Sequence, residues 1–201
     1  MLPHQPRIAA AQTAKFGRLE HTHTKAELPA AEDPLMADVS SEIRRADVFA
    51  LNAAPATPAA NLFVTDPRLV LRSDCDSQLL LHIPFNQGLK LATITLDCGE
   101  AADAPTRMRL YANFPSLGFS DLEGTKPTQE LVLSEADVRG RELKLALVRF
   151  TRVNSLHVFL EREDAETVSL SSIRFGGTPV EATKDLKDLG KTEEGHGHSH
   201  G

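Results

Sequence analysis

The chain has 201 residues, a hydrophobic fraction of 41% and a formal net charge of -6 at pH 7. This length accommodates one well-buried domain with tails. Because the negative balance gives no broad basic surface for phosphate contacts, we expect no nucleic-acid partner. No apolar run approaches the roughly 20 residues that span a bilayer, so we expect no membrane association.

The only cysteines are Cys75 and Cys98, and they form no C-x-x-C pair. Residues 1–6 lack the charged and apolar regions of a secretory signal. We therefore predict a cytoplasmic and nuclear protein with reduced thiols, no disulfide framework and no cofactor. Residues 1–37 are rich in Ala, Pro, Thr and His without helical or strand periodicity, which predicts a flexible leader.

The folded region is expected to begin with short, weakly patterned segments. Residues 41–52 follow an N-cap candidate at Ser40 or Ser41 and carry apolar residues at mixed spacing. This pattern predicts a short helical turn or an edge strand. A proline-containing loop at 53–60 should then lead to a docked apolar segment at 62–64.

An acidic stretch at residues 73–78 leads into a short, mostly apolar run at 79–83. The run is bounded by turn formers, which favours a strand covered on both faces over a helix. We expect Pro84 to end this strand and residues 86–88 to reverse the chain, with the glycine at positive φ. A second strand should then occupy 89–96.

Strand patterns continue along the chain. Residues 106–112 alternate strictly and place Met108, Leu110 and Ala112 on one face, so we expect this strand beside 89–96. Further strands are predicted at 129–133, 143–150, 155–161 and 167–175, with one helical turn at 134–140.

A bulge near Ser171 and Ser172 would keep all four apolar residues of the last strand facing inward: Val168, Leu170, Ile173 and Phe175. The spacing of these strands is typical of a sandwich rather than of βαβ units. We therefore predict an all-β, antiparallel β-sandwich whose core lies between two stacked sheets.

Five short motifs stand in order along the chain: SDCDSQLL at 73–80, PFNQ at 84–87, PTQEL at 127–131, VNSL at 153–156 and GTPVEAT at 177–183. Together they resemble the PITH domain family, a proteasome-interacting module at the C-terminus of thioredoxin-like proteins. The resemblance covers residues 38–191 and implies a jelly-roll-like β-sandwich, flanked here by flexible N- and C-terminal tails. It also implies association with the proteasome regulatory particle.

The sequence departs from the family pattern at Ala50, where a cysteine is expected. The thioredoxin domain that usually accompanies the module, with its C-x-x-C, is missing from this sequence. The resemblance therefore implies no redox activity.

The motif matches concentrate at strand ends and loops. Core strands accept many apolar combinations, and the residues of loops vary more freely unless a partner contacts them. A match concentrated in loops therefore indicates a binding surface. The expected partner-binding residues are Asp74, Cys75, Asp76, Gln78, Asn86, Gln87, Thr128, Gln129 and Thr178.

Asp74 and Asp76 flank Cys75 and admit three interpretations: a calcium site, turn-forming and capping side chains, or a partner-facing rim. Few other oxygen ligands accompany them, which disfavours calcium. Their charges should raise the pKa of the Cys75 thiol, and His82 lies in a strand whose packing decides its direction, so Cys–His hydrolase chemistry is not expected. The apolar residues 114–119 predict either a loop that plugs one end of the sandwich or an exposed partner anchor.

A Gly/His-rich tail occupies residues 192–201, where His196, His198 and His200 alternate with small residues. Neutral imidazoles bind zinc, copper and nickel, so the tail is either a solvated segment or a metal contact. The regulatory particle implied by the resemblance contains a zinc-dependent deubiquitinase. A catalytic zinc keeps an open coordination position, which a tail histidine could occupy in trans.

These observations predict a non-enzymatic adaptor or regulatory module that associates with the proteasome regulatory particle and is monomeric when free. Two other functions remain open. A small-ligand or carbohydrate-binding jelly roll would need an aromatic platform, which the lack of Trp and the single Tyr111 disfavour. A redox accessory acting with a separate thioredoxin would form a mixed disulfide through Cys75 or Cys98.

Overall fold

The computed structural model describes residues 37–64, 66, 68–99 and 102–180. The predicted leader at 1–37, except for its last residue, and the tail at 192–201, with its three histidines, lie outside the described residues. No helix in the described part is long and apolar enough to cross a membrane.

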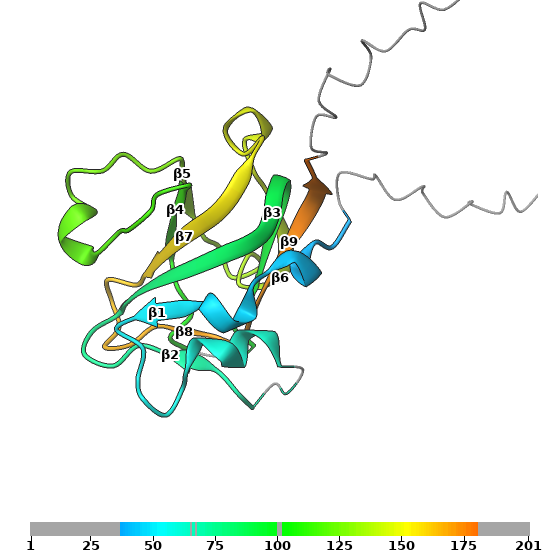
Figure 1. Cartoon of the computed structure of the whole chain (residues 1–201). Helices are drawn as coiled ribbons and strands as arrows, with labels where there is room; N and C mark the ends of the chain where they lie inside the picture. Colours follow the sequence, from blue (N-terminus) through cyan, green and yellow to red (C-terminus); the bar gives the residue numbers. More distant parts are fainter. Residues whose placement is uncertain (1–36, 65, 67, 100–101, 181–201) are drawn as a thin grey trace, which may run out of the picture. The chain divides into compact units, whose positions relative to one another are not determined.

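One long strand, β3 (Gln78–Asp97), runs through the whole domain (Figure 1). Its first half pairs with β1 (Phe49–Leu51) on one side and β7 (Val153–Glu161) on the other. Its second half pairs with β9 (Ser172–Pro179) and β6 (Arg139–Lys144). All of these pairs are antiparallel, as predicted. Because the two halves of β3 pair with different strands, β3 belongs to two layers at once.

The expectation that the strand ends at Pro84 and the chain turns back on itself is wrong. Pro84 pairs with Ser155, and its carbonyl accepts a bond from the N–H of Arg44 (2.9 Å), so the missing proline N–H does not end the strand. The register shifts between Pro84 and Leu89, where β3 bends from the first layer into the second. Gly88 does not adopt positive φ, and a Cβ there would lie 3.1 Å from Arg152 Cγ.

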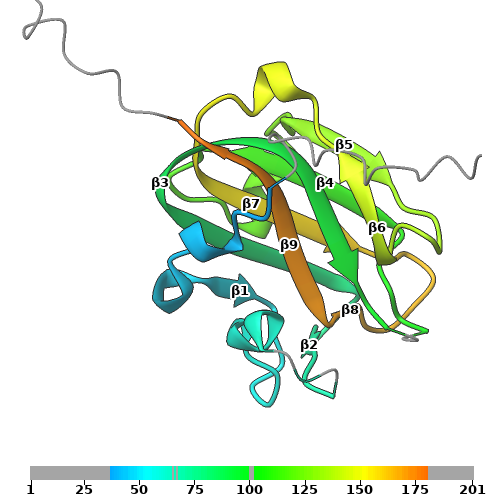
Figure 2. The same cartoon turned by 90° about the vertical axis from the view of Figure 1, so that its right-hand side faces the viewer.

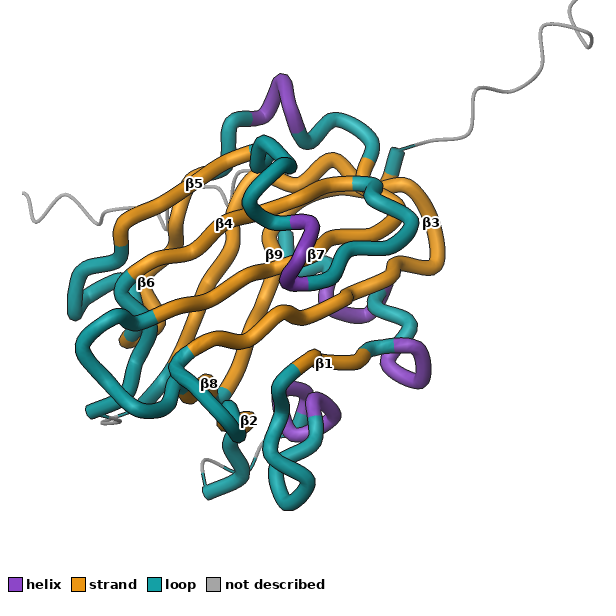
Figure 3. Tube along the Cα trace, turned by 90° about the vertical axis from the view of Figure 1, so that its left-hand side faces the viewer, coloured by secondary structure: helices purple, strands orange, loops and turns teal. Residues whose placement is uncertain are grey.

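The first layer is completed by β4 (Arg107–Ala112) and β5 (Gln129–Val132), in the order β1-β3-β7-β4-β5. The second layer consists of β9, the second half of β3, and β6. Figures 2 and 3 view the two layers from opposite sides. A small pair formed by β2 (Leu71–Arg72) and β8 (Ser169–Leu170) lies beside them. The prediction that β4 lies beside the strand at 89–96 is wrong, because β4 pairs with β7 and β5.

Alternate residues of both layers point into one core. From the first layer, Leu81, Leu110 and Val158 have no exposed surface. From the second, Ile94 and Phe175 are at most 1% exposed and belong to the same cluster. Burial of each such side chain contributes about 1.5–3 kcal/mol relative to leaving it exposed, which makes this shared core the main source of stability.

Several local predictions can be compared with the structure. The predicted single strand at 167–175 with a bulge is instead two strands: β8 ends at Leu170 and pairs with β2, and β9 begins at Ser172 and pairs with β3. The four apolar residues on both sides of Ser171 do face inward as expected, each at most 1% exposed. Residues 41–52 hold two 3-10 turns, η2 (Ser40–Glu42) and η3 (Arg45–Asp47), followed by β1. The docked segment forms η4 (Ala59–Phe63).

The predicted strand at 143–150 is wrong. The strand β6 ends at Lys144, and a 3-10 turn, η6 (Leu147–Arg149), follows it. We call residues 145–152 the β6–β7 loop. Leu145 and Phe150 are buried, but the residues between them face outward, so the apolar run is a loop held at both ends rather than a strand.

The apolar loop at 114–119 covers the outer face of the first layer rather than plugging an end. It leads into η5 (Phe119–Asp121), and Leu117 packs with Leu80 and Phe159 in a second apolar cluster. Figure 3 shows η5 in front of this sheet. The loop therefore serves as a cover for one sheet face.

Two histidines lie side by side under this outer face. His82 and His157 are directly opposite each other on β3 and β7, and His82 Nδ1 lies 3.0 Å from His157 Nε2, so one of these nitrogens carries the shared proton. Phe49 of β1 stacks on His82 with ring centroids 5.0 Å apart. Burial lowers the pKa of His157 to about 4, and the neighbouring His82 adds to the decrease. Burial likewise lowers the pKa of His82, with Arg44 contributing.

The folded domain should lose stability as the pH falls from 7 to 5. In this window the unfolded chain protonates its histidines, whose ordinary pKa is 6.5, while buried His157 stays neutral until about pH 4. His157→Gln should therefore reduce the slope of the unfolding free energy against pH by up to about 1.4 kcal/mol per unit, the value for one proton. Urea unfolding at several pH values measures both slopes. The difference should vanish between pH 7 and 8, and equal slopes below pH 7 would contradict the assignment.

A glycine fixes the approach of β9 to β3. A Cβ at Gly177 would lie 2.3 Å from the carbonyl oxygen of Lys90, and the other nearby atoms are also backbone. Gly177→Ala should therefore destabilise the domain by about 1–3 kcal/mol, because neither strand can move away freely. Gly124→Ala is the matched control, since a Cβ there meets nothing within 4 Å. A similar urea midpoint for both variants would show that the added methyl group does not strain the contact between β9 and β3.

Candidate partner interface

The acidic stretch before β3 is a loop organised by Asn52, which follows β1 and has a φ of 61°. Its Nδ2 donates to Asp76 Oδ1 (2.8 Å) and to the carbonyl of Gln78 (2.7 Å), and its Oδ1 accepts from the N–H of Cys75 (3.0 Å). Asp76 Oδ1 also accepts from the N–H of Gln78 at 3.0 Å. Asp76 is thus a turn-forming side chain, one of the three interpretations left open by the sequence.

Cys75 is exposed at this loop, and its Sγ donates to Asp74 Oδ2 at 3.6 Å. The negative charge of Asp74 raises the pKa of the Cys75 thiol, as expected from the sequence. Cys98 is buried, and burial raises the pKa of its thiol to about 12. Among the described residues, no three His, Cys, Asp or Glu side chains form a metal-binding group.

The bend of β3 places a second set of predicted residues at the other end of the first layer. We call this the bend end; it consists of residues 84–88, residues 178–180 and the β6–β7 loop, and lies at the top of Figure 1. The N–H of Val180 donates to the carbonyl of Gly88 at 2.8 Å, and Leu91 donates to Phe150 of the loop at 3.0 Å. Asn86 and Gln87 are exposed here, and neither side chain has a hydrogen bond within the described region.

Thr128 and Gln129, at the start of β5, brace this end. Thr128 Oγ1 accepts from the N–H of Ala112 (3.0 Å). Gln129 Oε1 accepts from the N–H of Ala146 (2.8 Å), and Gln129 Nε2 donates to the carbonyl of Lys144 (3.2 Å). Both side chains therefore hold the ends of loops in place. Thr178 lies on β9 opposite Lys90 and is half-buried.

The predicted residues thus fall into two groups. Asp74, Cys75, Asp76 and Gln78 lie where β3 begins, while Asn86, Gln87, Thr128, Gln129 and Thr178 surround or support the bend end. The structure brings the second group together around the β6–β7 loop. Sequence reasoning missed this loop because its apolar residues were assigned to a strand; the break in alternation between Leu147 and Val148 was the available signal.

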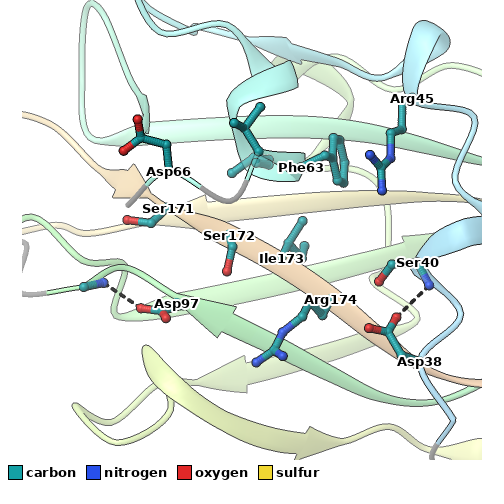
Figure 4. A pocket seen from close by; sticks show the side chains of 13 residues that line it. Asp38, Ser40, Arg45, Phe63, Asp66, Asp97, Ser171, Ser172, Ile173 and Arg174 are labelled. Carbon is teal, nitrogen blue, oxygen red and sulfur yellow. Dashed lines mark hydrogen bonds between the residues drawn. The ribbon is translucent and has the colours of Figure 1, made fainter. Parts of the chain in front are cut away.

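A pocket of about 590 Å³ lies elsewhere, between η4 and β9 (Figure 4). The Arg45 guanidinium lies 5.6 Å from the centre of the Phe63 ring, and Asp38 accepts a bond from the N–H of Ser40 at 2.8 Å. None of the residues predicted from the sequence lines it. Its walls come from four distant segments without a shared motif, so no sequence pattern indicated it.

Comparisons with solved structures agree with this architecture. The CBM32-1 and CBM32-2 domains of Clostridium perfringens ZmpB, solved with GalNAc, have a TM-score of 0.56 at 12% identity, covering 70% of this chain and 36% of that one. The family 32 CBM of C. perfringens NanJ, solved with galactose, has a TM-score of 0.51 at 8% identity, covering 67% and 97%. At these identities the likeness shows the fold alone, and it confirms the predicted jelly-roll β-sandwich.

Relatives found by sequence have higher identity to this chain than these solved structures do. Thioredoxin-like protein 1 of Schizosaccharomyces pombe is 37% identical over 125 residues, which cover 59% of this chain and 43% of that protein. PITH domain-containing protein 1 of Homo sapiens is 34% identical over 116 residues, covering 56% and 54%. The matches thus span about half the length of these relatives. The PITH domain family model matches residues 29–195, most of the chain, and the protein therefore belongs to the PITH domain family.

Proposed function

We propose that this chain is a non-enzymatic adaptor that docks on the proteasome regulatory particle through its bend end. The family's association with the proteasome supplies the partner. Asn86 and Gln87 carry the proposal, because they belong to a family motif yet are exposed, and their side chains make no hydrogen bond to any described residue. Motif residues such as Asp76 and Gln129 have internal roles that account for them without a partner.

The absence of a catalytic arrangement in the described residues supports a binding role. His82 is hydrogen-bonded with His157, and the hydrogen bond of Cys75 goes to Asp74, so the two are not joined as a nucleophile and base. The raised pKa of the exposed Cys75 thiol and the burial of Cys98 disfavour a redox accessory. The adaptor is monomeric when free and works in the cytoplasm and nucleus.

Docking should depend on the two exposed amides. With the full chain and purified regulatory particle, replacing both Asn86 and Gln87 by Ala should weaken binding at least about fivefold, since contacts at a binding centre are worth above about 1 kcal/mol. Replacing Ser116 and Ser120 by Ala is the control, because both are exposed in the segment formed by the 114–119 loop and η5, away from this end. If the double variant binds like the parent, the wrong face has been chosen. If the parent itself does not bind, the adaptor function is wrong.

The histidine tail supplies a second part of the proposal: His196, His198 and His200, which lie outside the described residues, reach a metal site of the partner in trans. His198 lies 18 residues beyond Val180, the last residue that the structure describes. A random-coil segment of that length has an r.m.s. reach on the order of 20–25 Å, enough to leave the surface of its own domain. A histidine on the open position of a catalytic zinc would exclude the attacking water.

Changing the three tail histidines to Asn should therefore leave binding within about twofold but raise the rate of deubiquitination by the docked particle. The rate is measured on a ubiquitinated substrate with saturating protein, and the parent chain is the reference. An unchanged rate would mean that the tail is only a solvated segment.

A further inference from the structure

The bend end carries positive charge on a chain whose net charge is -6. Residues 84–91, 144–155 and 176–180, which contain the bend end and its immediate flanks, carry Lys90, Lys144, Arg149 and Arg152 and no carboxylate. The neighbouring residues 37–44, which bond to Pro84 and Gly177, add Asp38 and Glu42 on the side away from the β6–β7 loop. None of these four cations takes part in an ion pair within the described part of the chain. Their charge is therefore available to a partner.

The same end displays exposed apolar side chains. Val148 is 85% exposed and the adjacent Leu147 is 37% exposed at the tip of the β6–β7 loop. Single exposed apolar residues are common, but two neighbours at the tip of a protruding loop, between basic residues, resemble the anchor of an interface. Figure 1 shows η6 projecting above the strands of the first layer.

This tip is held in one conformation. Bonds from Gln129 fix the start of the loop at Lys144 and Ala146. Arg149 Nη1 donates to the carbonyl of Thr128 at 2.9 Å, and its N–H donates to the carbonyl of Ala146 at 2.7 Å.

The far side of the loop is held as firmly. Phe150 has no exposed surface, and its carbonyl accepts from Leu91. Asn113 Nδ2 donates to the carbonyl of Arg152 at 2.8 Å. An anchor that is ordered before binding loses little conformational entropy when it docks.

This geometry explains part of the family motifs. Thr128 and Gln129 lie in one motif, and the N–H of Asn154, in another, donates to Asn113 Oδ1 at 2.8 Å. The Gln129 side chain acts on the loop and the Thr128 side chain on the end of β4, whereas Asn154 contributes its backbone N–H. The motifs therefore include the frame that presents Val148.

We propose that the β6–β7 loop is the anchor by which this domain docks, inserting Leu147 and Val148 into an apolar socket rimmed by carboxylates. The inference rests on the proposed docking to the regulatory particle and names the chemistry of the contact. The apolar tip fills the socket, while Lys90, Arg149 and Arg152 face acidic side chains around it. Such charge complementarity steers association and sets orientation.

A protein surface fits these features better than nucleic acid does. Phosphate binding would use the cations but would leave the exposed valine and leucine without a matching contact, and the chain as a whole is acidic. The partner is therefore an acidic protein surface with an apolar depression.

Val148→Glu tests the anchor. In a binding assay with the full chain and purified regulatory particle, the variant should bind at least about tenfold more weakly, because it places a carboxylate in an acidic-rimmed socket. Val132→Glu is the matched control, since Val132 is 81% exposed on the edge strand β5. Both variants should keep the urea midpoint of the parent, as both positions are open to solvent.

Arg152→Glu tests the rim. It should weaken binding several-fold and flatten the dependence of affinity on salt, whereas Arg174→Glu, an exposed arginine on β9, should do neither. The particle is treated with nuclease beforehand; loss of binding on this treatment would overturn the proposal in favour of nucleic acid.

The failures are distinguishable. If the parent binds and Val148→Glu binds as well as Val132→Glu, the anchor is wrong while the adaptor function stands. If Val148→Glu loses affinity for the particle but Arg152→Glu binds as tightly as Arg174→Glu, the acidic rim is wrong and the proposal is overturned in that part. If the parent does not bind the particle at all, the adaptor function falls and the anchor falls with it.

Discussion

The continuity of β3 through its bend is the constraint on which the rest of the structure depends. Because one strand belongs to both layers, the register of β7 on the first half of β3 and the register of β9 on its second half depend on each other. Gly177 lets the β9 backbone reach the carbonyl of Lys90 just after the bend. The pairing of β9 with β3 brings the end of β9 and the β6–β7 loop to the same end of the sandwich. The candidate interface is thus a consequence of how the layers are joined.

Side-chain amides replace backbone pairing where the strands end. Asn52 uses both its donor and its acceptor on the loop before β3, and Gln129 does the same on the loop after β6. A backbone group left unpaired in a partly buried loop would cost about 1–3 kcal/mol, so each amide has an energetic reason to be where it is. Asn also tolerates the left-handed conformation that Asn52 adopts. Polar residues in loop motifs therefore serve the fold as well as any partner.

Local patterns predicted the strands and their inward faces, because the alternation of apolar residues records which side is buried. The inward orientation of the apolar residues on both sides of Ser171 followed from that rule, although the chain forms two strands there rather than one strand with a bulge. Strand neighbours did not follow, since β4 pairs with β7 through contacts distant in sequence. The apolar residues after Lys144 also misled, because Leu145 and Val148 have similar hydrophobicity yet one is buried and the other exposed. In the same way, Asn86 and Gln129 are equally motif residues, one at 84–87 and the other at 127–131, and only the geometry separates an exposed amide from a bracing one.

The edges of both layers are poorly suited to adding a foreign strand. In the first layer, β1 has three residues and β5 has four. In the second, β6 presents a row of exposed charged side chains, and part of β9 is covered by residues 37–39, whose backbone bonds to Phe175 and Gly177 are each 2.9 Å long. Short, charged or covered edges are how soluble sheet proteins avoid edge-to-edge pairing. A partner that cannot extend a sheet has to be met by side chains on ordered loops, which is the kind of surface that the bend end provides.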